Sequence, residues 1–440
     1  MPLRNLPGGG ASYALLAFDE AGAERRDDPD GADGRLSQRI LDQLSADAAV
    51  TDVFLFAHGW NGDIADAIDQ YDRWIGAMEA QAADKAAMLK RRPNFKPYRI
   101  GVHWPSKAWG DETLGAAAAF AGTVDLVADY ANRLGDRQGL KERLEIVFQQ
   151  AARNPDADRL PPAAEQAYRE IDQLMVELGA GGEGAAPGSD RAAFDPQACF
   201  AAARDLAGPA SFGGGGFGGK LLAPLRVLSF WKMKQRGCEV GQTGVNDFLR
   251  ALQAALAGRA TRIHLMGHSF GCILSCAAIA GRPGGAALAP IASLMLAQGA
   301  MSLWSMCESI PVSPGQSGYF HALLADRRVA GAIVTTRSPF DTANRVFYPL
   351  GAGVAGQVDF AALSLPRYGA MGCFGLQGLA APAAEVALRA ADQDFDFPPG
   401  AVTNLEASAV IRNGTGPAGA HNDIAGPEVA HAIWSAAMSA

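Results

Sequence analysis

The sequence predicts an α/β protein in which a mostly parallel central sheet is covered by helices on both faces. Short apolar runs rich in β-branched and aromatic residues recur along the 440-residue chain, as is typical of buried strands. Segments with apolar residues at helical spacing separate most of these runs. Strands that alternate with helices favour a parallel sheet, because each crossover places a helix on a face of the sheet.

Seven segments are expected to be strands because they are short, apolar and bounded by turn residues. They are residues 12–18, 51–57, 98–104, 261–267, 291–297, 329–336 and 407–412. Apolar side chains at helical spacing predict helices at 64–89, 245–256 and 428–438. The uncharged stretch 283–307 is interrupted by Pro283, Pro290 and Gln298, so we expect a buried strand there and no transmembrane segment.

One long segment, from 110 to 225, breaks the alternation of strands and helices. It contains no strand pattern, and three of its stretches have the apolar spacing of amphipathic helices: 124–134, 140–152 and 164–178. We therefore expect a helical cap or lid inserted into the α/β fold.

Glycine-rich stretches at 179–190 and 211–220 follow the three helical patterns. Such composition predicts flexible joints, because glycine loses much conformational entropy on ordering. The expected domain organisation is an α/β core made of residues 1–109 and 226–440, with the cap at 110–225.

The composition excludes several classes of partner. The formal net charge is −8, and no long run of lysine or arginine occurs, which argues against nucleic acid or an anionic membrane as the partner. Six cysteines without a C-x-x-C pair do not form a disulfide framework. The first residues lack the apolar core of a secretory signal. We expect a cytoplasmic protein that acts on a small molecule.

Two patterns resemble ligand sites but lack features that such sites require. Residues 214–220 have the spacing of a phosphate loop, yet Leu221 stands where a hydroxyl would hold magnesium, and no strand precedes the loop. His264 and His268 are four residues apart, which would suit a metal on a helix, but they fall on a predicted strand and its turn. We expect neither a metal nor a cofactor.

The most informative motif is G-x-S-x-G at 267–271, with Ser269 at its centre. Gly267 and Gly271 flank the serine, as required where a strand reverses directly into a helix and leaves no room for Cβ atoms. A predicted strand precedes the motif and a helix-compatible stretch follows it. These features favour Ser269 as a nucleophile, and the alternative is a small residue that fills a tight corner.

The motif "GHSFG" resembles the nucleophile elbow of the α/β-hydrolase superfamily, and the upstream "LFAHGWNG" is similar to its oxyanion loop. With "HWPS" at the next strand, the chain looks like a poorly characterised group of microbial members. The resemblance covers about 50–108 and 226–435. It implies a serine hydrolase that cleaves carboxylic esters, including lipid-like ones, without a cofactor.

The resemblance also implies roles for particular residues. Ser269 would be the nucleophile, and the acid and then the histidine would follow it in the chain. His421 lies in a glycine-rich loop before the last helix, where the family keeps its base, whereas His431 falls within a helical pattern. Asp341 follows the strand at 329–336 through a short loop and is the expected acid. Glu308 is the alternative acid.

The oxyanion of an acyl-transfer reaction needs donors beside the nucleophile. The family pattern implies the backbone N–H groups of Trp60 and Phe270, supported by His58, Gly59 and His268. In the alternative reading, His58 and Gly59 form an ordinary turn at the end of a strand.

Two rival functions share these residues. An acyltransferase uses the same acyl-enzyme and differs only in the acceptor, and a non-catalytic binding or scaffold protein retains the fold without the chemistry. The sequence predicts no particular oligomeric state.

Overall fold

A computed structural model of the chain describes residues 3–28, 31, 33–60, 63–106, 123–135, 137–175, 179–205, 221–351, 365–414 and 418–440. Its centre is a nine-stranded sheet with the order β1-β2-β4-β3-β5-β6-β7-β9-β8. Only β1 and β2 pair antiparallel, and every other neighbouring pair is parallel. The predicted α/β fold class is confirmed.

The strands are β1 (Leu3–Asn5), β2 (Ser12–Ala17), β3 (Asp52–Ala57), β4 (Pro97–His103), β5 (Arg262–His268), β6 (Ser293–Ala297), β7 (Ile333–Arg337), β8 (Ala384–Ala387) and β9 (Val402–Glu406). The strand predicted at 407–412 is wrong, because the chain turns there. The true strand, β9, lies immediately before it. Thr403 and Asn404 made β9 look polar, yet both are buried, and Asn404 is satisfied by Thr335 and by the backbone of Leu376.

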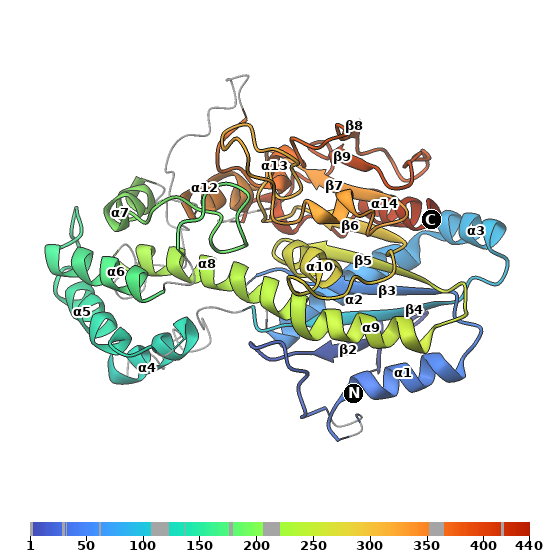
Figure 1. Ribbon diagram of the computed structural model, residues 1–440, viewed down its shortest axis with the longest axis horizontal. Coiled ribbons are helices and arrows are strands. Elements are labelled where there is room, and N and C mark those ends of the chain that lie inside the picture. The colour runs from blue at the N-terminus through green and yellow to red at the C-terminus, as the bar shows by residue number, and fades with distance from the viewer. Residues whose placement is uncertain are drawn as a thin grey trace.

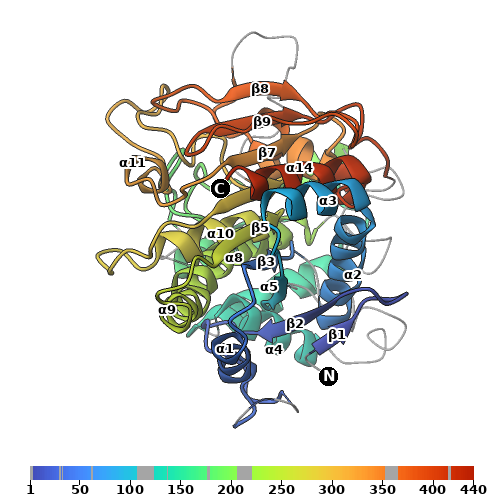
Figure 2. The same cartoon turned by 90° about the vertical axis from the view of Figure 1, so that its right-hand side faces the viewer.

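Helices cover both faces of the sheet (Figure 2). One face carries α1 (Leu36–Ala46), α8 (Ala223–Val240), α9 (Asn246–Ala255) and α10 (Gly271–Ala280), and the other carries α2 (Ile64–Ala80), α3 (Ala82–Arg91) and α14 (Pro427–Met438). The helix predicted over 64–89 is in fact two helices that meet at Gln81. Shorter helical segments are α11 (Ala322–Ala325), α12 (Tyr348–Gly351), α13 (Met371–Phe374), η2 (Gly241–Val245), η3 (Ala343–Phe347) and η4 (Ala420–Asn422).

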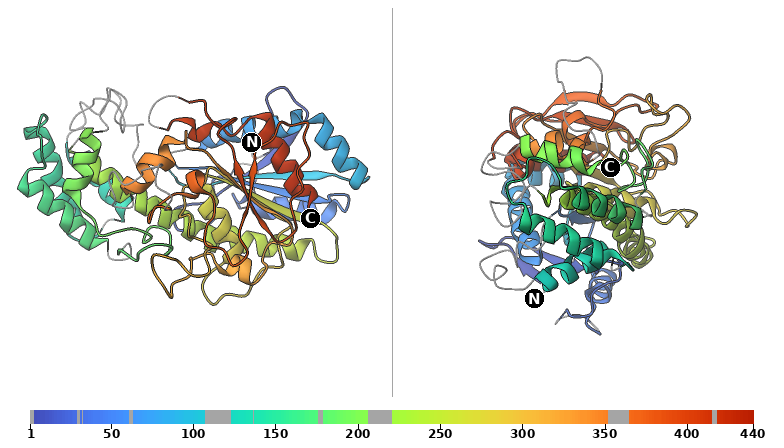
Figure 3. Two further views of the ribbon diagram at one scale, coloured as in Figure 1. Left: turned by 90° about the horizontal axis from the view of Figure 1, so that it is seen from above. Right: turned by 90° about the vertical axis from the view of Figure 1, so that its left-hand side faces the viewer.

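A group of helices lies beyond the carboxyl ends of the strands (Figures 1 and 3). It consists of α4 (Thr123–Leu134), α5 (Leu140–Arg153), α6 (Pro162–Leu174) and α7 (Pro196–Asp205). Their apolar side chains pack on one another and on α8, so that Leu144, Val147 and Ile171 are buried. The described part of the predicted insertion is therefore helical, and its apolar faces are covered by protein.

The two glycine-rich stretches differ in what the structure describes. Residues 211–220 lie outside the described part of the chain. Residues 179–190 form a loop whose last residue is anchored. Asp190 is buried and accepts hydrogen bonds from Lys234 Nζ of α8 at 2.5 Å and from the Tyr348 hydroxyl at 3.2 Å. Among the described helices, none has the length and apolar character needed to cross a membrane.

Candidate functional site

Ser269 occupies the turn between β5 and α10, at the carboxyl edge of the sheet. Its φ is +56°, a left-handed conformation that few residues other than glycine adopt. The residue is almost fully buried. Its backbone N–H donates to Ala297 O and its carbonyl accepts from Ala300 N, both at 3.2 Å. The segment that follows β6 therefore holds this strained turn in place.

Glycines allow the turn to approach the end of β3 closely. A Cβ atom on Gly271 would lie 2.1 Å from Ala57 O, and one on Gly59 would lie 2.7 Å from Ser269 Cβ. A Cβ on Gly267 would also collide, at 2.4 Å from Gly271 O. These contacts explain why all three positions of the motif and its neighbouring loop lack a side chain.

Asp341 and His421 are brought together although 80 positions separate them in the chain. His421 Nδ1 lies 2.8 Å from Asp341 Oδ2. Asp341 is fully buried after β7, and His421 lies in η4, just before α14. Glu308, the alternative acid, is exposed on a loop. Within the described residues, no hydrogen bond joins the Ser269 hydroxyl to His421, a contact that is often loose in the absence of substrate.

His268 connects the serine turn to the loop that carries His421. Its Nε2 lies 2.9 Å from His421 O, and its Nδ1 lies 2.9 Å from Gln70 Nε2 of α2. Burial lowers the pKa of His268 well below its usual value, so the ring is neutral. The two partners then assign the proton to Nε2, because Gln70 donates to Nδ1 and His421 O accepts.

His58 shapes the loop after β3, where the oxyanion donors were predicted. Its Nδ1 donates to Gly59 O at 2.9 Å, and its Nε2 accepts from Trp104 N at 3.3 Å. Burial, and secondarily the charge of His103, lowers the pKa of His58 to about 3. The ring is therefore a neutral structural element of this loop.

Trp60 lies in the loop after β3, and Phe270 lies in the turn after β5. The centroids of their rings are 5.8 Å apart. Phe230 of α8 packs on both rings, at 5.7 and 5.0 Å. Neither the Trp60 nor the Phe270 backbone N–H donates a hydrogen bond to a described residue. Two donors thus remain uncommitted beside Ser269, under a side chain of α8.

His431, the other histidine near the end of the chain, lies elsewhere. It is buried on α14, where its Nδ1 lies 2.7 Å from Asp84 Oδ1 of α3. This hydrogen bond raises the pKa of His431. The pair ties two helices together on one face of the sheet.

The sequence reasoning missed two residues that bind Asp341. Gln298 Nε2 donates to Asp341 Oδ2 at 3.0 Å, and Asn344 Nδ2 donates to the same oxygen at 2.7 Å. A signal was present for Gln298, since a polar residue at the end of a buried strand needs a partner. Asn344 follows Asp341 by three residues, and its backbone N–H also binds the carboxylate.

A pocket of about 210 Å³ lies between the loop after β3, α2 and the segment after His421, and neither Ser269 nor His421 lines it. Its walls include Gly59, Trp60, His268, Gln70, Arg73 and Asn422. The described residues contain no group of three or more metal-binding side chains close enough to share an ion. All six cysteines are buried and free.

A second set of the same residue types lies inside the sheet. Ser293 Oγ is 2.8 Å from His264 Nδ1, and His264 Nε2 is 3.0 Å from Asp52 Oδ1. All three are buried. Asp52 also pairs with Arg92. His264 is therefore part of a buried hydrogen-bond network that joins β3, β5 and β6.

Compared with known proteins, the chain matches no family model, and neither a curated protein nor a solved structure gives a match. The geometry of the site is therefore the basis for a functional proposal.

Proposed function

We propose that the protein is a serine hydrolase of the α/β-hydrolase type that cleaves carboxylic esters through an acyl-enzyme intermediate. The observation that carries the proposal is the buried Asp341–His421 hydrogen bond, whose loop contacts the residue before a serine held at positive φ. A serine on a strained strand-to-helix turn is the arrangement that presents a nucleophile at the edge of a parallel sheet.

The proposed roles follow from the hydrogen bonds. Because His421 Nδ1 donates to Asp341, its Nε2 is unprotonated and accepts the proton of the Ser269 hydroxyl. Ser269 Oγ then bonds to the ester carbonyl carbon, whose oxygen becomes an oxyanion. When this intermediate collapses, the bond to the alcohol breaks, and His421 gives its proton to the leaving oxygen. Water repeats the sequence on the acyl-serine and releases the acid.

The backbone N–H groups of Trp60 and Phe270 are the proposed oxyanion donors. Both are uncommitted within the described residues, and fixed donors of this kind stabilise the charge that develops in the transition state. His58 supports the proposal because it fixes the loop through Gly59 and Trp104 without carrying a charge itself.

The helices α4 to α7 are proposed as a cap over this edge. They lie beyond the carboxyl ends of the strands (Figure 1), the edge at which parallel sheets bind ligands. Phe230 of α8 already contacts Trp60 and Phe270. A small or lipid-like ester would bind between the cap and the serine turn, and a cytoplasmic location fits the six free cysteines.

A fluorophosphonate probe tests the proposal, because it reacts covalently with an activated serine. We expect the wild-type protein to be labelled at Ser269 and to hydrolyse p-nitrophenyl esters, with rates across acyl-chain lengths defining the preferred substrate. Ser269→Ala should abolish both reactions. Ser275→Ala is the matched control, since Ser275 is also buried, on the next helix, and should react like wild type.

The other outcomes separate the rival functions. A folded wild-type protein that neither reacts with the probe nor hydrolyses any ester of the series would be a binding or scaffold protein. Transfer of the acyl group to an added alcohol in preference to water would identify an acyltransferase.

A further inference from the structure

Gln298, at the end of β6, has a backbone conformation that is costly for a residue with a side chain. Among the described residues, four that are not glycine have positive φ: Asp33, Ser269, Gln298 and Arg327. Asp33 and Arg327 are exposed, whereas Ser269 and Gln298 are buried at the carboxyl ends of the neighbouring strands β5 and β6. Such strain persists only where the surroundings enforce it, and it clusters at functional sites.

The side chain of Gln298 is fixed from β7. Thr336 Oγ1 donates to Gln298 Oε1 at 3.0 Å and accepts from Gln298 N at 2.9 Å. With its oxygen bound to Thr336, the amide can direct only its NH₂ group toward Asp341 Oδ2, at 3.0 Å. A glutamate at this position would have no donor to offer.

The Asp341 carboxylate receives four donors in this arrangement. Oδ2 faces Gln298 Nε2, Asn344 Nδ2 and His421 Nδ1, and Oδ1 accepts from Asn344 N. Asn344 Nδ2 also donates to Gln298 O at 2.9 Å. Hydrogen bonds to a charged group are stronger than neutral ones, so the carboxylate is held in one orientation.

The backbone around Gln298 holds the serine turn at the same time. Ala297 O accepts from Ser269 N, and Ala300 N donates to Ser269 O. Residues 297–300 therefore form hydrogen bonds to Ser269 through their main chain and to Asp341 through the side chain of Gln298.

We propose that Gln298 is a positioning residue that fixes Asp341, and through it His421, relative to Ser269. This inference rests on the proposed function, in which Asp341 orients the base. Gln298 touches neither substrate nor the reacting atoms, so its effect is on the rate of acylation and not on binding.

The test replaces Gln298 with methionine, which has a similar length and no donor. We expect kcat per active site to fall by about 10- to 100-fold, as for the loss of a hydrogen bond to a charged group, with KM nearly unchanged. Thr335→Val is the matched control, because Thr335 is the neighbouring buried residue of β7 and its hydroxyl binds Asn404 instead. Its kcat should stay within about twofold of wild type.

Fluorophosphonate titration supplies the number of active sites, so that a loss of folded protein is not mistaken for a decrease in kcat. In an Asp341→Asn background, Gln298→Met should add less than about twofold, because the positioned group is already lost. A purely structural role predicts the same additional loss in both backgrounds.

The outcomes separate the two proposals. Wild-type protein that fails to react at Ser269 overturns both. If wild type reacts and Gln298→Met reacts equally fast per active site, only the positioning role is overturned. The same conclusion follows if the Gln298→Met and Asp341→Asn losses are fully additive.

Discussion

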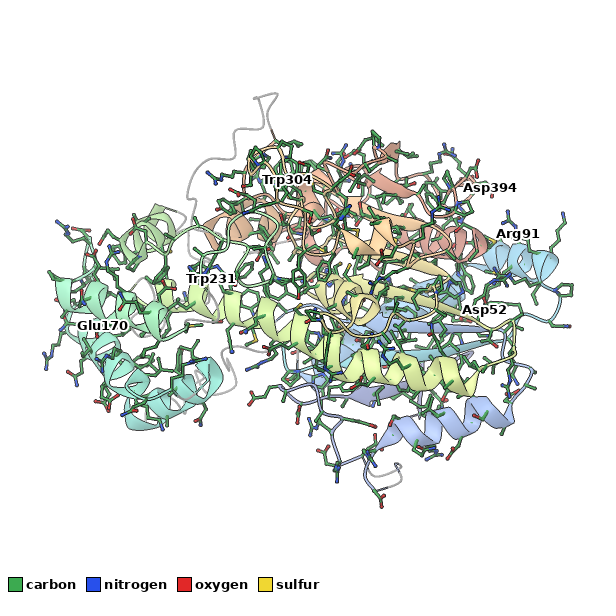
Figure 4. All side chains as sticks on the ribbon, in the orientation of Figure 1. Asp52, Arg91, Glu170, Trp231, Trp304 and Asp394 are labelled. Carbon is green, nitrogen blue, oxygen red and sulfur yellow. The ribbon has the colours of Figure 1, made fainter. Side chains whose placement is uncertain are left out.

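Two groups of serine, histidine and aspartate within the described residues have different surroundings, and the one that contains Ser269 lies at the carboxyl ends of the strands. In the inner group, Ser293, His264 and Asp52 are joined by a continuous chain of hydrogen bonds. Asp52 and Ser293 are the first residues of β3 and β6, at the amino ends of the strands. Figure 4 labels Asp52 near the end of the sheet that faces away from Trp231 of α8 and Glu170 of α6.

The outer group lies at the opposite edge and is less completely hydrogen-bonded. Ser269 has a strained backbone and makes no hydroxyl contact with His421 among the described residues, yet uncommitted N–H donors lie beside it. Ser293 lies in a regular buried strand. Under the proposed function, three residue types in hydrogen-bonding order are a weaker indication of catalysis than their surroundings. Backbone conformation, donors for an oxyanion and the edge of the sheet are the stronger signals.

The largest expected effect separates the two serines. Ser269→Ala should reduce kcat by about 10⁶-fold, because the elements of a nucleophile–base pair act as a unit. Ser293→Ala should leave kcat per folded molecule unchanged, since Ser293 only partners a buried histidine. Initial rates with a p-nitrophenyl ester measure both. Loss of activity in Ser293→Ala with retention in Ser269→Ala would reverse the comparison.

The histidines should divide in the same way. His421→Ala is expected to match Ser269→Ala at about 10⁶-fold, because the serine then lacks its base. His431→Ala removes a comparable hydrogen bond to a carboxylate, that of Asp84, and should affect stability but not turnover. The base would have to be reassigned if His421→Ala kept more than a tenth of wild-type activity and His431→Ala did not.

Substitutions of the two aspartates are expected to change different properties: turnover for Asp341 and stability for Asp52. Asp341→Asn should slow turnover by about 10⁴-fold with substrate binding nearly unchanged, because the imidazole takes the wrong tautomer. Asp52→Asn should instead lower the free energy of unfolding by about 3–5 kcal/mol, since it leaves Arg92 without its buried partner. Urea unfolding and kcat per active site distinguish the two. Glu308→Gln should have only a mild effect on turnover. A larger loss of turnover in Glu308→Gln than in Asp341→Asn would reassign the acid to Glu308.

The smallest effect concerns the dependence of stability on pH. His58 has a folded-state pKa of about 3, below its ordinary value near 6.5. Between these two pH values, the unfolded chain binds a proton at His58 that the folded protein does not bind. Stability therefore falls as pH decreases from about 6.5 toward 3, by about 1.4 kcal/mol per pH unit from this group. His58→Gln should flatten this decline, as measured by urea midpoints between pH 5 and 7.

His431 provides the contrast in sign. Its pKa is raised by the hydrogen bond to Asp84, so it contributes stability below the unfolded pKa and loses it as pH rises through the folded one. His431→Gln should therefore remove a loss of stability that occurs as pH rises above about 6.5, and should leave the slope between about pH 5 and 6 unchanged. An unchanged slope between pH 5 and 6 in His58→Gln, or a changed one in His431→Gln, would contradict these assignments.

The sequence predicted β2 to β7 because these strands are largely buried and read as apolar runs. The sequence did not predict the edge strands β1 and β8, which contain no buried residue and lack such a pattern. It failed at β9, where Thr403 and Asn404 satisfy their polar groups inside the sheet. The proximity of Asp341 and His421 was implied by the family resemblance, and the structure places them within hydrogen-bonding distance. Gln298 could not be predicted as their neighbour, because its contacts depend on the register of β6 beside β7.

The inserted region shows a similar limit. Its helical spacing was sufficient to predict α4, α5 and α6. Composition alone suggested that 179–190 is a flexible joint, whereas Asp190 is anchored by Lys234 and Tyr348. A buried ion pair between distant positions leaves no local pattern, so this anchor could not be predicted from the sequence.

The pairing of β3 with β5 has a consequence for how the chain is made. His264 and Asp52, which bridge these strands, are separated by 212 positions, and the helices α4 to α8 are synthesised between them. At about 5–20 residues per second, ribosomes need roughly 10–40 s to extend the chain from β3 to β5. Throughout that interval one edge of β3 has no partner, and an unpaired apolar strand invites aggregation. The central pairing of the sheet therefore cannot form until the chain has been synthesised past residue 262.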